Sequence, residues 1–214
     1  MTEGKAYLRK LMNQKRQELT AAEKDQAAAG LAVHLAAFLR LRYGGTPETR
    51  RLQIAVYAAI RSELDLTECC KLLRQWQADL YFPAVCRATG GDYLAFGRLP
   101  ENRSPAEFLR PGAFGVPEPP AESLLSETPR LDLLLIPGLA FDRRGGRLGW
   151  GKAYYDRLLA AMKSSSLRVG IGYAFQLLPT LLPCDEQDQN MDVILTPDGW
   201  IDADPCFLPE QSGQ

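Results

Sequence analysis

The sequence lacks the features that mark a membrane, secreted or nucleic-acid-binding protein. No window approaches the 18 or more apolar residues of a membrane span, and the first residues lack the apolar core of a secretion signal. Lys plus Arg number 25 against 26 Asp plus Glu, so the formal net charge of -1 supplies no overall attraction to nucleic acid or to an anionic membrane. We therefore expect a cytoplasmic protein with neither nucleic-acid nor membrane partners.

The cysteine and histidine content argues against both disulfide bonds and a structural zinc site. The five cysteines are odd in number and show no C-x-x-C spacing, and His34 is the single histidine. A disulfide framework and a Cys/His zinc site are both disfavoured by this pattern. His34 lies in an Ala/Leu-rich stretch, where a structural role is the simpler interpretation.

The N-terminal part of the chain predicts two helices. Residues 3–19 combine apolar positions with a basic face, which is typical of an amphipathic helix with solvated charges. The residues of this basic face are Lys5, Arg9, Lys10, Lys15 and Arg16. A second helix is expected to begin at Thr20, whose spacing to Glu23 predicts a capping box, and to run to about Leu41 before the break at "RYGGTPETR".

The remaining chain alternates predicted strands with predicted helices. The expected strands cover residues 52–59, 78–85, 92–99, 131–138, 167–174 and 191–197, and the expected helices cover residues 66–77 and 152–163. The run "LDLLLIPG" is continuously apolar, as in a strand covered on both faces. This alternation favours an α/β fold with a mostly parallel sheet and helices on both faces. No linker divides the chain, so we expect one domain over residues 1–214.

The stretch "GGRLGWGKAYYDRLL" combines the features of an anion site. A Gly-rich turn that follows a buried strand and opens into a helix presents free backbone N–H groups to an anion. Arg147 and Lys152 add positive charge, while Asp142 and Asp156 supply carboxylates that suit magnesium. The combination indicates a nucleotide phosphate with its metal, although each feature alone also occurs in plain structural connections.

Two familiar nucleotide motifs do not fit this stretch. Residues 146–152 match G-x-x-x-x-G-K, but Ala153 follows where a P-loop needs a Ser or Thr hydroxyl for magnesium. A dinucleotide fingerprint fails as well, because Tyr154 stands where its last glycine is required. The stretch is therefore interpreted as a phosphate site of another kind.

The longer run "PGLAFDRRGGRLGWGKAYYDRLL" resembles the signature of the 5-formyltetrahydrofolate cyclo-ligase family. That signature reads P-G-x-A-F-D, two variable residues, then G-x-R-L-G-x-G-x-G-Y-Y-D-R. The segments "KAYLR", "AVYAAIRSELDL", "FGVPEP", "IGYAFQ" and "DQNMDVILT" are similar to further family motifs. Two positions differ: Ala153 replaces the usual third glycine, and Gln187 stands where a histidine often precedes Asp188.

The resemblance implies a fold and an activity. The fold is a three-layer α/β/α sandwich, similar to sugar-phosphate isomerases and coenzyme A transferases. The activity is an ATP- and Mg2+-dependent conversion of 5-formyltetrahydrofolate to 5,10-methenyltetrahydrofolate, with release of ADP and phosphate. In the mechanism proposed for this class, ATP phosphorylates the formyl oxygen, and N10 then attacks the activated carbon as phosphate departs. The expected partners are the folate substrate and ATP, and we expect a monomer.

The resemblance also implies roles for individual residues. Arg147 and Lys152 are expected to be catalytic, and Asp142 and Asp156 are expected to hold magnesium. The residues expected to contact ATP are Lys5, Arg9, Arg147, Leu148, Gly149, Trp150, Gly151, Lys152, Ala153, Tyr154 and Tyr155. The residues expected to contact folate are Ala58, Glu63, Trp150, Gly151, Lys152, Ala153 and Tyr154. Glu63 suits a 2-aminopyrimidinone edge because a carboxylate can accept paired hydrogen bonds from it.

Two other functions remain compatible with this sequence. A sugar-phosphate isomerase shares the expected fold, but it needs no ATP and leaves the Lys5/Arg9 pair unexplained. A folate- or nucleotide-binding protein without turnover is the second alternative, suggested only by Ala153. Asp192 fits either a structural cap or a site residue.

Overall fold

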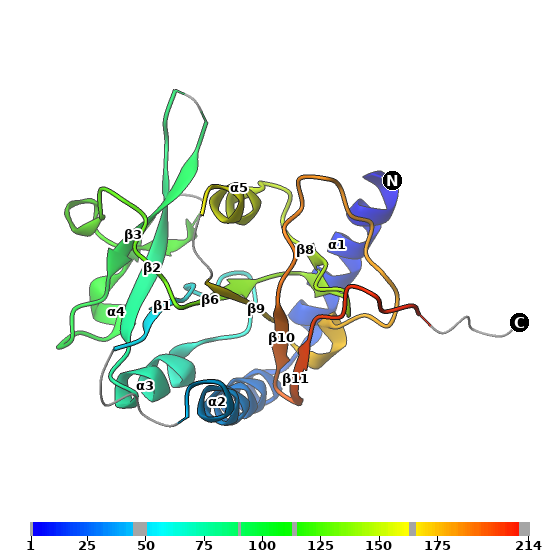
Figure 1. Ribbon diagram of the computed structural model, residues 1–214, viewed down its shortest axis with the longest axis horizontal. Helices are drawn as coiled ribbons and strands as arrows, with labels where there is room; N and C mark the ends of the chain where they lie inside the picture. The colour runs from blue at the N-terminus through cyan, green and yellow to red at the C-terminus, as the bar shows by residue number, and fades with distance from the viewer. Residues whose placement is uncertain (1, 45–50, 90, 113–114, 163–165, 210–214) are drawn as a thin grey trace, which may run out of the picture.

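A seven-stranded sheet forms the centre of the computed structural model, which describes residues 2–44, 51–89, 91–112, 115–162 and 166–209 (Figure 1). Its strand order is β11-β10-β9-β6-β1-β2-β3. The five inner strands are parallel, and the edge strands β3 and β11 are antiparallel to their neighbours. The sheet strands are β1 (Gln53–Ala55), β2 (Asp79–Cys86), β3 (Tyr93–Arg98), β6 (Leu133–Pro137), β9 (Leu167–Ile171), β10 (Val193–Thr196) and β11 (Gly199–Asp202).

Helices cover both faces of the sheet, which confirms the expected α/β fold with a mostly parallel sheet. Figure 1 shows α2 and α3 on one side of the sheet and α5 on the other, with α1 beside β8. The helices are α1 (Thr2–Glu18), α2 (Ala21–Tyr43), α3 (Thr67–Gln75), α4 (Pro105–Phe108) and α5 (Tyr154–Ala161), with single turns η2 (Ala121–Ser123) and η3 (Ala174–Gln176). Two small ribbons complete the fold, β4 (Arg110–Pro111) with β5 (Pro117–Glu118), and β7 (Ala140–Phe141) with β8 (Arg147–Leu148).

Alternating side chains of the central strands divide the core between the two faces. Leu133 and Leu135 of β6 pack with α2 and α3, whereas Leu134 and Ile136 pack with α5. All four side chains are buried, as expected for a strand covered on both faces. A third apolar cluster joins α1 to the β7–β8 ribbon and includes Met12. The ribbon thereby connects the N-terminal helix to the carboxyl end of β6.

Locally determined features follow the sequence closely. The Thr20 hydroxyl accepts the N–H of Glu23, and the Glu23 carboxylate accepts the N–H of Thr20, so the predicted capping box is confirmed. Gly44 ends α2 in the left-handed conformation, with φ 72°. No described helix has the length and apolar character needed to cross a membrane. The expected break at residues 45–50 and the expected helix end at Lys163 lie outside the described residues.

Four expectations about local structure are corrected by the tertiary arrangement. The strand expected at 52–59 is ordered only over β1, because the chain leaves the sheet after Val56, whose N–H donates to Tyr81 O. The helix expected from Lys152 begins at Tyr154. The sequence did not predict strands β4, β5, β7, β8 and β11, which are two to four residues long. Arg16 was grouped with solvated charges, yet its side chain is completely buried.

Candidate active site

A cavity of about 1050 Å3 opens at the carboxyl ends of the parallel strands β1, β2 and β6. The chain runs from β1 to β2 on one side, whereas β6 lies on the other side of β1. Such a switch in strand order leaves a crevice where α/β folds bind ligands. Helix α1, the turn after β1, the signature segment and residues 185–189 form its walls.

Nearly all of the expected site residues line this one cavity. Those present are Lys5, Arg9, Ala58, Glu63, Arg147, Leu148, Gly149, Trp150, Gly151, Lys152, Ala153, Tyr154, Tyr155 and Asp156. Asp142 does not line it. Expected site residues from three segments far apart in sequence are therefore brought to one place.

Asp142 stabilises the turn that precedes the phosphate-loop segment. Its buried carboxylate accepts the N–H groups of Arg144 at 2.9 Å, Gly146 at 2.9 Å and Leu182 at 2.7 Å. A Cβ atom at Gly146 would lie 2.5 Å from Asp142 Oδ2, so this close approach requires glycine. The three hydrogen bonds occupy the carboxylate that was expected to hold magnesium, and its position does not support that role.

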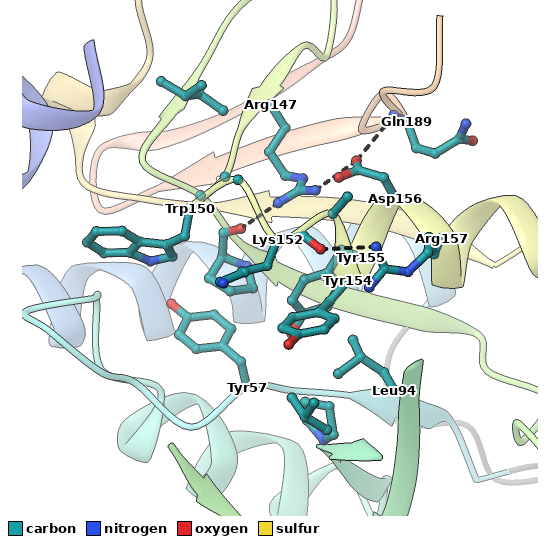
Figure 2. Close-up of a pocket in the computed structure, with 18 of the residues that line it drawn as sticks. Tyr57, Leu94, Arg147, Trp150, Lys152, Tyr154, Tyr155, Asp156, Arg157 and Gln189 are labelled. Atoms are coloured by element: carbon teal, nitrogen blue, oxygen red, sulfur yellow. Dashed lines mark hydrogen bonds and ion pairs between the residues drawn. The ribbon is translucent and has the colours of Figure 1, made fainter. Parts of the chain in front are cut away.

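Arg147 contributes a nearly buried positive charge to the cavity wall. Its Nη2 donates to Asp156 Oδ1 at 2.9 Å, and its side chain is only 5% exposed (Figure 2). Its Nη1 donates to Pro137 O at 3.4 Å, and the guanidinium lies 5.6 Å from the centre of the Tyr155 ring. Within the described residues, its buried Nε has no hydrogen-bond partner. The guanidinium thus places a fixed positive charge at the cavity wall, where it can attract an anionic ligand.

Arg9 fixes the Gly149–Gly151 segment against α1. Its Nε donates to Gly149 O at 2.9 Å. Gly151 has a φ of 88°, and a Cβ atom there would lie 3.4 Å from Arg9 Nη2. That distance is an ordinary van der Waals contact, so the positive φ, and not lack of space, is what favours glycine at this position.

Lys5 joins α1 to the segment after β9. Its ammonium donates to Asp185 at 2.7 Å and to Asp188 at 2.8 Å. Burial alone would lower the pKa of Lys5, but the two carboxylates outweigh it and raise this pKa. Burial would likewise raise the pKa of Asp188, whereas the bonds from Lys5 and from the Asp185 N–H lower it. Sequence reasoning missed both aspartates as cavity residues, although they belong to the acidic stretch "CDEQDQ".

Glu63 lines the cavity from the turn after β1. Its Oε2 accepts the Ile60 N–H at 3.1 Å, and its Oε1 accepts the Trp150 indole N–H at 3.2 Å. Burial raises the pKa of the Glu63 carboxyl, and the hydrogen bond from Ile60 and the charge of Arg16 only partly oppose this effect. The carboxylate is therefore held in place but incompletely solvated, which favours a ligand that donates hydrogen bonds.

The β2–β3 hairpin closes the cavity beside α5. The Tyr154 hydroxyl donates to Asp92 Oδ2 at 3.3 Å, and Arg157 Nη2 donates to Asp92 O at 3.0 Å. The Arg157 guanidinium lies 5.3 Å from the centre of the Tyr154 ring. Asp92 was not expected from the sequence, because its role depends on the hairpin reaching the start of α5.

Ala153 adopts the backbone conformation that the usual glycine would favour. It precedes α5 with φ 52° and ψ 24°, in the left-handed region. This conformation costs an L-residue about 1 to 2 kcal/mol. The substitution therefore changes the backbone energy of the loop as well as adding a methyl group.

Ala153→Gly is expected to stabilise the protein. Removing the left-handed strain outweighs the extra unfolded-state entropy of glycine, so we expect a gain of about 0.5 kcal/mol in the free energy of unfolding. Urea denaturation measures this change. Ala29→Gly, at an exposed position inside α2, is the matched control and should lose about 1 kcal/mol. If both variants lost the same free energy of unfolding, the backbone of Ala153 would not be strained.

The described residues contain no group of three or more His, Cys, Asp or Glu side chains arranged to hold a metal ion. Magnesium commonly needs only one or two carboxylates when substrate phosphates supply the other ligands. Asp156 is the expected carboxylate that does line the cavity, although Arg147 and the Gln189 N–H at 3.4 Å already contact its Oδ1.

Comparison with known proteins gives one consistent result. Residues 1–197 match the model of the 5-formyltetrahydrofolate cyclo-ligase family. The chain is 28% identical to the 5-formyltetrahydrofolate cyclo-ligase of Haemophilus influenzae over 91% of this chain and 98% of that protein. It is also similar to the solved structure of a 5,10-methenyltetrahydrofolate synthetase from Mycoplasma pneumoniae, with a TM-score of 0.65 and 27% identity over 90% of this chain and 98% of that chain. The solved 5,10-methenyltetrahydrofolate synthetase of Aquifex aeolicus gives a TM-score of 0.67 and 29% identity over 97% of each chain. The chain therefore belongs to the 5-formyltetrahydrofolate cyclo-ligase family.

Proposed function

We propose that this protein converts 5-formyltetrahydrofolate to 5,10-methenyltetrahydrofolate with consumption of ATP. The observation that carries the proposal is the nearly buried guanidinium of Arg147, which lines the cavity beside the glycine-rich segment 149–151. A phosphoryl group is an oxygen-rich anion that arginine binds with well-directed hydrogen bonds. Membership in the cyclo-ligase family supplies the folate substrate.

The two walls of the cavity suit the two substrates. We assign the phosphates of ATP to the wall formed by Lys5, Arg9 and the segment 147–155, which presents cations and backbone N–H groups. We assign the pterin of the folate to the adjoining part of the lining, where Glu63 accepts hydrogen bonds and Trp150, which borders both parts, offers an aromatic face. Ala58 lines the same wall and leaves space for the ring. The cavity volume of about 1050 Å3 accommodates two such ligands together.

The proposed reaction is a phosphoryl transfer followed by ring closure. The formyl oxygen attacks the γ-phosphorus, so that an O–P bond forms and the bond from phosphorus to the ADP oxygen breaks. N10 then attacks the formyl carbon and loses its proton, and the C–O bond breaks as the ring closes, so that inorganic phosphate leaves with that proton. Arg147 and Lys152 neutralise charge on the transferring group, and magnesium would add further neutralisation between the phosphates and Asp156. No protein nucleophile is required.

An absorbance assay tests this function. Purified protein mixed with 5-formyltetrahydrofolate, magnesium and ATP should produce the methenyltetrahydrofolate band, and the ATP-free control should stay flat. A flat trace from folded protein that binds both ligands would favour the alternative of a binding protein without turnover. A sugar-phosphate isomerase is not favoured, because the chain belongs to the cyclo-ligase family and an isomerase needs no ATP and leaves the Lys5/Arg9 pair without a role.

Lys152→Met is expected to reduce turnover far more than it weakens folate binding. Lys152 lines the cavity at the phosphate loop, and removing its charge from the transition state should lower kcat by about 100-fold. Folate affinity, measured by equilibrium titration without ATP, should change by less than about threefold. Lys10→Met, at an exposed position of α1, is the charge-matched control. Unchanged turnover in Lys152→Met would remove this residue from the phosphate site.

Three further expectations belong to the same proposal: one domain over residues 1–214, a monomer, and a cytoplasmic location. Light scattering coupled to size-exclusion chromatography at the assay concentration measures the oligomeric state directly.

A further inference from the structure

Arg16 is a completely buried arginine whose partners are backbone carbonyl groups. It lies on α1, and its exposed fraction is 0%. Its Nε donates to Ser62 O at 2.9 Å, and its Nη2 donates to Arg61 O at 2.6 Å and to Ile60 O at 3.2 Å. Three successive carbonyl groups of one turn therefore converge on a single guanidinium.

The turn held by Arg16 has a strained backbone. Arg61 and Ser62 both occupy the left-handed region, with φ values of 48° and 60°. Each such residue costs about 1 to 2 kcal/mol, so two in succession persist only where other contacts stabilise them. The same turn presents Glu63 to the cavity, because the Glu63 N–H donates to Ile60 O at 2.8 Å. The position of the Glu63 carboxylate thus depends on this conformation.

Arg16 also contacts the aromatic residue that Glu63 binds. Its guanidinium carbon lies 5.7 Å from the centre of the Trp150 ring, and that of Arg61 lies 5.0 Å from it. The indole N–H of Trp150 donates to Glu63. Arg16 therefore contacts the turn that carries the carboxylate and the ring bonded to that carboxylate.

Burying this guanidinium is unfavourable for folding by itself. Its Nη1 is buried without a hydrogen-bond partner within the described residues. Burial lowers the pKa of Arg16, and the charge of Glu63 only partly restores it. An apolar side chain of similar volume would avoid both penalties. What the guanidinium adds is a set of directed N–H groups that hold the three carbonyls in one geometry.

We propose that Arg16 is a positioning residue for the folate side of the site: it holds the Ile60–Ser62 turn and thereby orients Glu63 and Trp150. This inference rests on the proposed function for the identity of the ligand. Arg16 does not line the cavity, so it acts through the other two residues. Its loss should weaken recognition of the folate and leave the cations Lys5, Arg9 and Arg147 of the ATP wall in place.

Arg16→Met tests the inference with two measurements. Hydrogen exchange followed by mass spectrometry should show about tenfold faster exchange in the segment 60–64, since the turn loses its three hydrogen bonds. The KM for 5-formyltetrahydrofolate should rise by at least about tenfold, and the KM for ATP should change by less than about twofold. A role in general stability alone would not separate the two KM values.

Two further variants keep the test decisive. Lys10→Met, on the exposed side of the same helix, should leave exchange and both KM values unchanged. Arg16→Lys keeps the charge but has fewer directed N–H groups, so it should give intermediate values and serves if the Met variant does not fold. Unchanged exchange at 60–64, or equal rises in both KM values, would overturn the inference. The exchange measurement needs no substrate, so inactivity of the wild-type protein would contradict the proposed function and not this role.

Discussion

Arg147→Met is expected to lower kcat by about 1,000-fold, the largest effect of any single change in this protein. The guanidinium is nearly buried at the cavity wall, and its Nε is directed at no described protein group. A fixed positive charge in such a site stabilises the charge that develops on a transferring phosphoryl group and needs no reorganisation during the reaction. The measurement is steady-state turnover at saturating ATP and folate.

Loss of activity must be separated from loss of stability in this variant. Removing Arg147 leaves the Asp156 carboxylate without its ion pair in a largely buried position, which costs about 3 kcal/mol. The double variant Arg147→Met/Asp156→Asn removes both charges and should recover much of this stability without recovering turnover. Arg130→Met, at an exposed position, is the control for loss of an arginine charge. Full turnover in Arg147→Met would exclude Arg147 from the phosphate site.

Glu63→Gln is expected to raise the KM for 5-formyltetrahydrofolate by about 30-fold without a comparable change in the KM for ATP. The variant loses a charged acceptor of hydrogen bonds, and such bonds contribute about 2 kcal/mol, which corresponds to this factor. The difference between the two KM values distinguishes a folate contact from a general loss of structure. Glu122→Gln, at an exposed position, is the matched control, and equal KM values in the two variants would contradict the assignment.

The raised pKa of Glu63 predicts opposite effects of pH on binding and on stability. Burial raises this pKa in the folded protein, so the carboxylate needed for folate binding is lost as pH falls through the raised value. As pH falls, the kcat/KM for folate should therefore decrease, and the decrease should begin at a pH above the ordinary pKa range of a carboxyl group. Glu63→Gln should not show this decrease.

The stability effect of the same group has the reverse sign. A raised folded-state pKa means that the folded protein binds the proton more tightly than the unfolded chain does. The stabilisation is thus fully present below the unfolded pKa and is lost as pH rises through the folded pKa. As pH rises from the unfolded pKa to the folded pKa, the free energy of unfolding should therefore fall less in Glu63→Gln than in the wild-type protein. Urea denaturation at several pH values measures this difference.

The sequence alone was sufficient for features that depend on neighbouring residues. The capping box of Thr20 and Glu23 joins residues three positions apart, and the structure has both of its hydrogen bonds. The continuous apolar run of β6 predicted a central strand, since only a strand covered on both faces tolerates such a run. The signature from Pro137 to Arg157 indicated the cyclo-ligase family, to which the chain belongs.

The site was only partly predictable, because several roles depend on distant contacts. Lys5 bonds to Asp185 across 180 positions, and Trp150 bonds to Glu63 across 87 positions. Asp142 has the residue type of a metal ligand, yet the backbone N–H groups around it form a turn. No pattern among neighbouring residues shows which distant partners a side chain will have, or whether a buried aspartate binds a metal or stabilises a turn.

Arg16 shows most clearly what the tertiary structure decided. In sequence it is one of several cations on an amphipathic helix, where charged residues are usually solvated. In the folded protein it is buried against carbonyl groups 44 to 46 positions away. Hydrophobic periodicity determined that residues 2–18 form a helix, because it reports the side chains that share one helix face. Which cation of that helix is buried depends on where the turn after β1 lies, and only the packing of the whole chain determines that position.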